Sequence, residues 1–469
     1  MPRHFNPWAS YKPPTAFEKL TSLSLRLNGP PKNDERIPIR KTPIFPSGPP
    51  EPDEGPRVIW LGHASVYLLL PHLTSAGTRE WRGILFDPVF SERCSPVSFL
   101  GPRRRITVPC RVGDLPRVDV VCISHDHYDH LDKASIKLIE QYHSDVKYYV
   151  PQGLKALLSK FGVSSGRVRE MNWWEEDLLP LSHESKGSAS SPGLKVERTV
   201  YMSASSPTKS QSSLSEKEYQ SLALSPVPEV NNNGIDEVPF SPKSHIPPIT
   251  PSTLCNTIST PSPTGNEGGR GGMKIVCCPA QHNSGRKLFG KNKTLWCTWW
   301  IEWELPGGEW WKCFFGGDTG YRSVKGVPTC PAFKLIRNRY GSPDLALLPI
   351  AHGSVLPYLQ SLLPIIKFDA PRLTSSIHCS PSDAISLHQE LGAKVSIPIH
   401  WATWSTESGT KEIIRALRFT CRDDAVGLKW YDEMKGGLPD SSHEGGVVVC
   451  DIGTTVSLGL RSGLICTAE

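Results

Sequence analysis

The sequence has no apolar run long enough to cross a membrane as a helix. A spanning helix needs about 20 consecutive apolar residues, and the longest candidate, Val58 to Leu70, is interrupted by Gly62 and His63. The first residues, MPRHFNPWAS, also lack the apolar centre of a secretory signal. These two absences predict an intracellular protein that does not span a bilayer.

Paired cysteines and strong charge are missing as well. The 13 cysteines are scattered, with no CxxC pair and one vicinal pair, Cys277–Cys278, which favours reduced thiols over a disulfide framework. The net charge of +6 is mild and the basic cluster Arg103–Arg105 is short, so we expect no nucleic-acid partner. That cluster is either a solvated loop or a contact for a lipid phosphate.

Composition divides the chain into an arm, a body and an insertion. Residues 1–55 are rich in Pro and charge and predict an N-terminal arm over the body, with a helix from Phe17 to Leu27. Residues 56–469 are expected to form one domain. The stretch at about 182–272 is rich in Ser, Pro, Asn and Gly with almost no aromatic residues, which predicts a disordered insertion.

Short apolar runs bounded by Gly, Pro and Asp predict buried strands in the body. The runs are RVIWLGHASVYLLL, GILFDPVF, VDVVCISH, KIVCCPAQH, TLWCTWWIEW, KCFFGGDTGY, LALLPI and KVSIPIHW. Helical spacing occurs from Pro151 to Gly162, and again after Ser380, where Asp383 completes a capping pattern. Because strands alternate with helices, the fold class is predicted to be α/β.

The strongest chemical signal is an HxHxDH run directly after the apolar strand VDVVCI. It contains His125, His127, Asp129 and His130. Imidazole nitrogen suits zinc, and a carboxylate adds a harder oxygen ligand and compensates charge. A tight loop at a strand end can aim several such side chains at one point, so we interpret the run as metal-binding rather than as a polar loop.

Further ligands must come from distant positions, because one such run cannot complete two metal sites. His282 follows KIVCCPAQ, Asp318 follows KCFFGG, and His400 follows KVSIPI. A single strand-end His or Asp is more often a structural hydrogen-bonding residue. Three matching placements beside HxHxDH indicate ligands.

These runs resemble the metallo-β-lactamase superfamily, and within it the family of phospholipases D that hydrolyse N-acylphosphatidylethanolamine. HxHxDH is typical of the whole superfamily, whereas the flanking runs are similar to the family. The matching segments are Asn6-Pro7-Trp8, WLGHAS at Trp60, FDPVFS at Phe86, GPRR at Gly101, SHDHYDHLD at Ser124, NWWEE at Asn172, PAQH at Pro279, GGDTGY at Gly316 and IHW at Ile399.

The resemblance implies an αββα sandwich of two mixed sheets between helices, and two Zn²⁺ ions. One ion would be held by His125, His127 and His282. The other would be held by Asp129, His130 and His400, with Asp318 bridging both ions.

Three further residues take supporting roles by the same resemblance. Asp87 and His63 would orient ligand imidazoles by hydrogen bonds, although turn and strand packing would also explain them. His378 matches a position near the substrate phosphate, so we expect it to help Asp318 in catalysis.

The implied activity is hydrolysis of N-acylphosphatidylethanolamine to N-acylethanolamine and phosphatidic acid, without a covalent enzyme intermediate. A membrane phospholipid as substrate implies peripheral membrane contact, and a homodimer is compatible with the sequence. Cytoplasmic and membrane-associated locations both fit. The basic N-terminus permits mitochondrial targeting, but Glu18 and Asn6-Pro7-Trp8 argue against a long cleaved presequence.

Departures from the family leave alternatives open. The family has a Gly-Ala-Tyr-Glu-Pro-like turn where this chain has Ile350-Ala351-His352-Gly353-Ser354 followed by extra residues to Ser376, and it lacks the long insertion. Another hydrolase of this fold, acting on a lactone, a cyclic phosphate or RNA, is therefore the second interpretation. A non-catalytic scaffold is the third, although scaffolds of this fold generally lose metal ligands.

Overall fold

The computed structural model describes residues 3–25, 34–180, 272–286, 290–306, 308–323, 328–363, 365–433, 446–459 and 465–466. The predicted insertion at 182–272 lies outside the described residues except for Gly272, so its disorder stays a prediction. None of the described helices is both long and apolar enough to cross a membrane.

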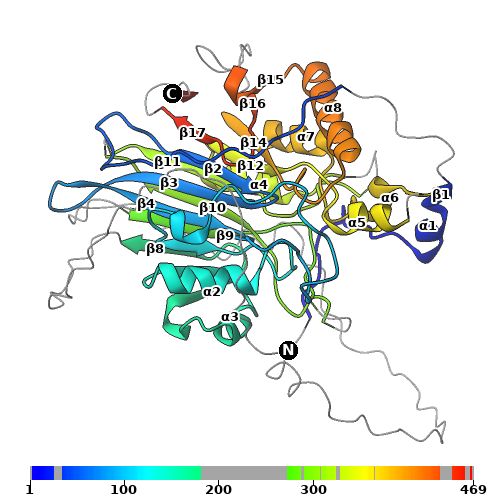
Figure 1. Cartoon of the computed structure of the whole chain (residues 1–469), viewed down its shortest axis with the longest axis horizontal. Helices are drawn as coiled ribbons and strands as arrows, with labels where there is room; N and C mark the ends of the chain where they lie inside the picture. Colours follow the sequence, from blue (N-terminus) through cyan, green and yellow to red (C-terminus); the bar gives the residue numbers. More distant parts are fainter. Residues whose placement is uncertain are drawn as a thin grey trace, which may run out of the picture. The chain divides into compact units, whose positions relative to one another are not determined.

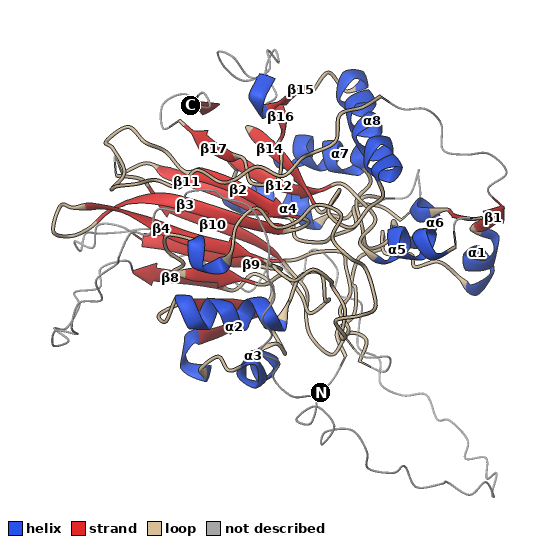
Figure 2. Cartoon of the chain, viewed as in Figure 1, coloured by secondary structure: helices blue, strands red, loops and turns tan. Residues whose placement is uncertain are grey.

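Two mixed eight-stranded sheets form the centre of the described chain (Figures 1 and 2). In the β10 sheet the order is β15-β16-β14-β12-β11-β10-β9-β8, and in the β3 sheet it is β18-β17-β2-β3-β4-β5-β6-β7. The strands of the β10 sheet are β8 Glu176–Pro180, β9 Gly272–Cys278, β10 Thr298–Glu304, β11 Trp310–Phe315, β12 Leu345–Pro349, β14 Val395–Ile399, β15 Gly427–Trp430 and β16 Gly446–Val449. Those of the β3 sheet are β2 Arg57–Gly62, β3 Ser65–Leu73, β4 Arg79–Phe86, β5 Val120–Cys122, β6 Lys147–Pro151, β7 Val168–Met171, β17 Thr455–Leu458 and β18 Ile465–Cys466.

The main core lies between the two sheets. Along β3, Val66 and Leu68 belong to this core, whereas Tyr67 and Leu69 belong to a second core on the other face, as the alternation of side chains along a strand requires. The rings of Phe86 and Phe315 stack across the sheets with centroids 4.5 Å apart. Because both faces of the sheets are covered, their strands read as continuous apolar runs.

Helices cover the outer faces of both sheets. The side chains of α2 and α3 pack into the core outside the β3 sheet, and those of α4, α7 and α8 pack beside the β10 sheet. The predicted αββα sandwich is therefore confirmed. The helices are α1 Ala16–Thr21, α2 Lys133–Tyr142, α3 Lys155–Phe161, α4 Ala332–Tyr340, α5 Val355–Leu362, α6 Ala370–Thr374, α7 Pro381–Leu391 and α8 Glu407–Asp423.

The predicted capping residues of two helices are confirmed. Ser380 caps α7, with Asp383 completing the capping box. Gly162 ends α3 with φ of 107°, a left-handed conformation that glycine adopts without steric cost. Ser380, two residues after His378, thereby fixes the start of α7 at Pro381.

Two sequence predictions about elements are wrong. Pro151 does not begin a helix but ends β6, and α3 begins at Lys155. The helix predicted from Phe17 to Leu27 ends at Thr21, and the chain continues as β1 (Leu23–Leu25). The strand prediction for RVIWLGHASVYLLL is confirmed, and the run forms a hairpin of two strands, β2 and β3.

The strand β1 belongs to a small separate sheet of two strands. It pairs antiparallel with β13 (Ile366–Phe368), so that Leu23 lies opposite Phe368 and Leu25 opposite Ile366. This pairing joins the N-terminal arm to the run between Ala351 and Ser376.

Candidate metal centre

The HxHxDH run forms a tight loop at the carboxyl end of β5. The amides of His130 and Leu131 both donate to the carbonyl of His127, at 3.2 and 2.9 Å. Before the loop, Ser124 donates its amide to Asp87 Oδ1 at 2.7 Å. The turn and this anchor bring the side chains of the run to one edge of the β3 sheet.

The three distant candidates lie beyond strand ends at one edge of the β10 sheet. The strands β11, β12 and β14 are parallel, and β9 has the same direction because β10 is antiparallel to both β9 and β11. Since parallel strands end at one edge, His282 after β9, Asp318 after β11 and His400 after β14 are brought together. All three side chains are buried.

One group of donors consists of His125, His127, His282 and Asp318. His125 Nε2 lies 2.8 Å from His127 Nδ1 and 3.2 Å from His282 Nε2. Asp318 Oδ2 lies 3.4 Å from His282 Nε2. The residues that the resemblance assigned to the first zinc are therefore adjacent.

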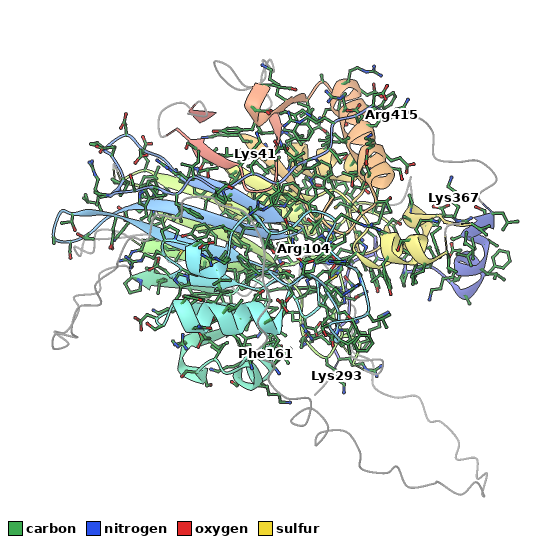
Figure 3. All side chains as sticks on the ribbon, viewed as in Figure 1. Lys41, Arg104, Phe161, Lys293, Lys367 and Arg415 are labelled. Carbon is green, nitrogen blue, oxygen red and sulfur yellow. The ribbon has the colours of Figure 1, made fainter. Side chains whose placement is uncertain are left out.

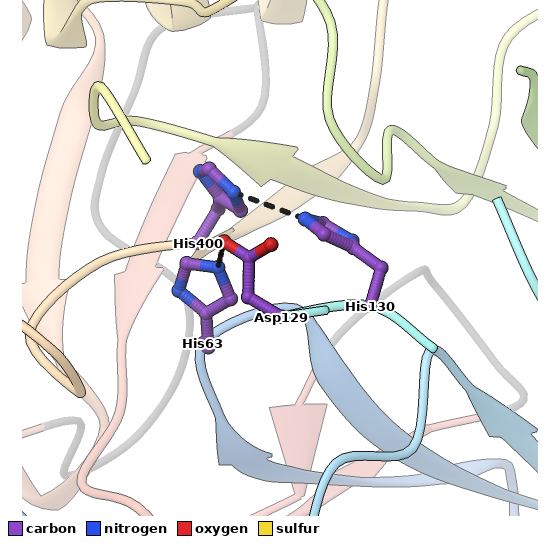
Figure 4. A group of neighbouring side chains, drawn as sticks. All are labelled: His63, Asp129, His130 and His400. Carbon is purple, nitrogen blue, oxygen red and sulfur yellow. Dashed lines mark hydrogen bonds and ion pairs between the residues drawn. The ribbon is translucent and has the colours of Figure 1, made fainter. Parts of the chain in front are cut away.

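A second group consists of His63, Asp129, His130 and His400 (Figure 4). His130 Nε2 lies 3.2 Å from His400 Nε2, and His63 Nε2 lies 3.1 Å from Asp129 Oδ2. His63 was expected only to support ligands, but here its ring nitrogen lies among them. The sequence feature that could have identified His63 as a donor is its position at the end of an apolar strand. His282, Asp318 and His400 also follow apolar strands.

Asp318 lies between the two groups. Its Oδ2 is 3.4 Å from the Nε2 atoms of both His282 and His400, and 3.7 Å from that of His130. Its Oδ1 is buried and has no hydrogen-bond partner among the residues that the structure describes. A buried carboxylate oxygen without a partner is costly, so a cation at this point would satisfy it.

His378, the predicted catalytic helper, lies beside Asp318. Its Nε2 is 3.0 Å from Asp318 Oδ2, and it forms a third donor group with Asp318 and His400. Its Nδ1 is buried without a hydrogen-bond partner in the described part of the chain. His352 lies near these residues too, with its Nδ1 3.0 Å from Thr374 Oγ1, and burial lowers the pKa of its imidazole to about 3.

Outer hydrogen bonds fix which nitrogen of several imidazoles faces the centre. The Nδ1 atom of His130 lies 2.7 Å from Asp87 Oδ2, that of His282 lies 2.7 Å from the carbonyl of Ile377, and that of His400 lies 3.3 Å from the carbonyl of Ala351. These acceptors require a proton on Nδ1, so in the neutral rings each Nε2 presents a lone pair. Lone pairs that face one another at about hydrogen-bond distance fit a bound metal cation.

Burial and charge act together on the acidity of these groups. Burial lowers the pKa values of His125 and His282 well below 6.5, which keeps both rings neutral. Burial also disfavours the charged form of His130, but nearby carboxylates, Asp129 first, raise its pKa to about 9. Burial would raise the pKa values of Asp129 and Asp318, yet the imidazoles around them hold both well below 3.8. The site therefore favours positive charge at its centre.

Three residues of the site adopt left-handed backbone conformations. The φ angles are 51° for His63, 39° for Asp87 and 63° for His400. Each costs about 1 to 3 kcal/mol for a residue other than glycine. Tertiary hydrogen bonds hold them, because His400 donates its amide to the carbonyl of His63 at 2.8 Å and His63 donates its own to Thr403 Oγ1 at 2.6 Å.

Replacement of Asp87 by asparagine should weaken metal binding about 10- to 100-fold, because a partner that orients a ligand contributes that much. The carboxylate holds His130 Nδ1 and also accepts from Ser124. Competition with a chelator of known affinity measures the effect. The matched control is Asp451→Asn, a buried carboxylate paired with Arg36, which should leave metal affinity unchanged; equal affinities for the two variants would contradict the role of Asp87.

An αββα sandwich with His and Asp side chains gathered at one edge of its sheets is the architecture of a metal-dependent hydrolase. Comparison with known families agrees with this class. The model of the beta-lactamase superfamily domain matches residues 82–216 and 237–401. The chain belongs to this superfamily.

Two curated relatives share the name of one activity. The N-acyl-phosphatidylethanolamine-hydrolyzing phospholipase D 1 of Caenorhabditis elegans is 26% identical over 350 residues, which is 74% of this chain and 63% of that protein. The mitochondrial N-acyl-phosphatidylethanolamine-hydrolyzing phospholipase D of Saccharomyces cerevisiae is 24% identical over 346 residues, again 74% of this chain but 47% of that protein. The match thus spans 47% to 63% of the length of these relatives.

Among solved structures, the metallo hydrolase Igni18 of Ignicoccus hospitalis has a similar fold. The match covers 87% of this chain and 99% of Igni18. The TM-score is 0.40 and the sequence identity 14%.

Proposed function

We propose that the protein is a binuclear zinc phosphodiesterase of the phospholipase D type, which hydrolyses N-acylphosphatidylethanolamine to N-acylethanolamine and phosphatidic acid. The observation that carries this proposal is the pair of donor groups that meet at Asp318. Zinc is favoured because most of the donors are imidazole nitrogens, with carboxylates completing the set. The names of the two relatives support the lipid substrate.

His125, His127 and His282 would hold one ion, and Asp129, His130 and His400 the other, with Asp318 shared between them. When bound, such a pair supplies a nucleophile from water near neutral pH and stabilises both the attacking and the leaving oxygen of an in-line displacement at phosphorus. The pair therefore suits a phosphodiester.

The residues of the chain contribute position, burial and proton control. The ring nitrogens are held by their outer hydrogen bonds, so the ligands need no reorganisation when substrate binds. His378 would contact the phosphate; its position beside Asp318 and its Nδ1, which has no partner within the described protein, support this role. Water adds to phosphorus, the bond from phosphorus to the ethanolamide oxygen breaks, and the leaving oxygen takes up a proton.

The test is hydrolysis of N-acylphosphatidylethanolamine in mixed micelles, with phosphatidylcholine, phosphatidylethanolamine and a cyclic nucleotide assayed beside it. In oxygen-18 water, attack at phosphorus places the label in phosphatidic acid. We expect N-acylethanolamine without label, detected by mass spectrometry. Label in the ethanolamide, or turnover of the cyclic nucleotide alone, would refute the phospholipase D assignment.

A further inference from the structure

Five short elements form a small substructure, here called the apolar lobe: α1, β1, α5, β13 and α6. It joins the N-terminal arm to residues of the 351–376 run, where the chain departs from its family. Besides the β1–β13 pairing, Asp369 donates its amide to the carbonyl of Ser22 at 2.9 Å, and α1 contacts α6 as α5 contacts β13. The lobe lies beside the sandwich, to the right in Figure 1.

The lobe exposes large apolar side chains. None of the residues of α1, α5 or α6 is buried. The exposed large apolar side chains on the lobe and in its α5–β13 connection are Phe17, Leu20, Leu23, Leu25, Val355, Leu362, Leu363 and Ile365. Single exposed apolar residues are common, but a gathering of this kind marks a surface that contacts a partner or a membrane.

A cavity of about 380 Å³ lies between the lobe and residues that border the candidate metal centre. The lobe supplies Leu356 and Phe368 to its wall, and the other side includes Ala351, His352 and Gly353. Two of these residues touch the metal centre itself. The carbonyl of Ala351 faces His400 Nδ1 at 3.3 Å, and Gly353 lies so close to His378 that a Cβ there would be 2.9 Å from His378 Nε2.

The charges of the lobe suit phospholipid headgroups. Lys19, Lys367 and Arg372 are exposed, and Lys367 is visible on the lobe in Figure 3. The carboxylates of Glu18 and Asp369 accept backbone amide bonds at the starts of α1 and α6. Basic side chains beside exposed apolar ones are the pattern of proteins that lie on a lipid surface.

We propose that the apolar lobe is a docking surface for a phospholipid bilayer, and that it places the adjoining cavity where a lipid can pass from the bilayer to the metal centre. The passage of a lipid substrate rests on the proposed function, whereas the docking itself does not. A bilayer is favoured over a second copy of the chain because cations are interspersed with the apolar side chains and because the cavity beside the lobe borders Ala351 and Gly353, which contact the site.

Sedimentation of the full chain with phosphatidylcholine vesicles tests the docking. Phe17→Glu, Leu20→Glu and Ile365→Glu should each weaken binding to the vesicles about tenfold or more, because each removes one large apolar side chain from the lipid interface. The matched control is Phe419→Glu on α8, where the side chain is 58% exposed outside the lobe. This control should bind vesicles as the wild type does.

Unchanged vesicle binding by the three lobe variants would overturn the proposal, as would an equal loss in the Phe419 control. A lobe variant that breaks a dimer of the wild type without weakening vesicle binding would show a self-association surface instead. Metal content and thermal unfolding verify that each variant is folded. Because the vesicles contain no N-acylated lipid, docking can hold even where the hydrolysis test fails, so the two proposals fail separately.

Discussion

Replacement of Asp318 by asparagine is expected to lower kcat/KM for phosphodiester hydrolysis by about three orders of magnitude or more. The carboxylate faces imidazoles of both donor groups, and metal ions held in place contribute several kcal/mol of charge stabilisation, where each 1.36 kcal/mol is about tenfold in rate. An amide retains the size of the side chain but lacks its charge. Steady-state kinetics with metal analysis of the same preparation measure both effects.

The control for this variant is Asp344→Asn. Asp344 precedes β12, whereas Asp318 follows the parallel strand β11, so the two lie at opposite ends of neighbouring strands. The carboxylate of Asp344 accepts a hydrogen bond from the amide of Lys312 at 2.8 Å and another from the ammonium group of Lys394. Activity close to that of the wild type is expected for Asp344→Asn. Normal activity of Asp318→Asn on every phosphodiester that the wild type cleaves would show that Asp318 does not bridge the ions.

Removal of the metal by a chelator should abolish hydrolysis and lower the melting temperature by on the order of 10 °C. A ligand present at about 1,000 times its Kd stabilises the folded state by about 4 kcal/mol, and each kcal/mol moves the melting temperature of a large domain by about 2 to 4 °C. Elemental analysis before chelation should find close to two zinc ions per chain. Calorimetry of the chelated and the zinc-reconstituted protein measures the shift.

Recovery of activity on adding zinc is the control for damage by the chelator. One result would contradict a metal-dependent reaction: full activity in a sample in which elemental analysis finds no metal. A content of one ion per chain at saturating zinc would instead contradict the binuclear assignment, because two donor groups meet at Asp318.

The sandwich fold and the proximity of the candidate ligands could be predicted from the sequence for one physical reason. Buried strands read as apolar runs, and a His or Asp directly after such a run lies at a sheet edge. The argument works for His282, Asp318 and His400 because β9, β11 and β14 have one direction. The same argument could have placed His63 among the donors, since it follows β2.

Other features depend on contacts that no local pattern reveals. The start of α3 has no side-chain cap of its own. Instead Glu170, from β7, accepts the amides of Gly153 and Lys155 at 2.6 and 2.9 Å, which explains why a helix start at Pro151 was wrongly predicted. In the same way, β1 exists only because β13, more than 300 residues further along the chain, pairs with it.

The left-handed conformations of His63, Asp87 and His400 have a consequence for how the protein acquires its metal. Their cost is met when the chain folds, because the His63 amide donates to Thr403 Oγ1 and the Ser124 amide donates to the Asp87 carboxylate, and neither bond involves a metal ion. Association with an ion then requires little ordering of the backbone, unlike metal-binding domains that fold only around their ion. The same rigidity disfavours larger cations, since donors fixed in this way cannot move apart to surround them.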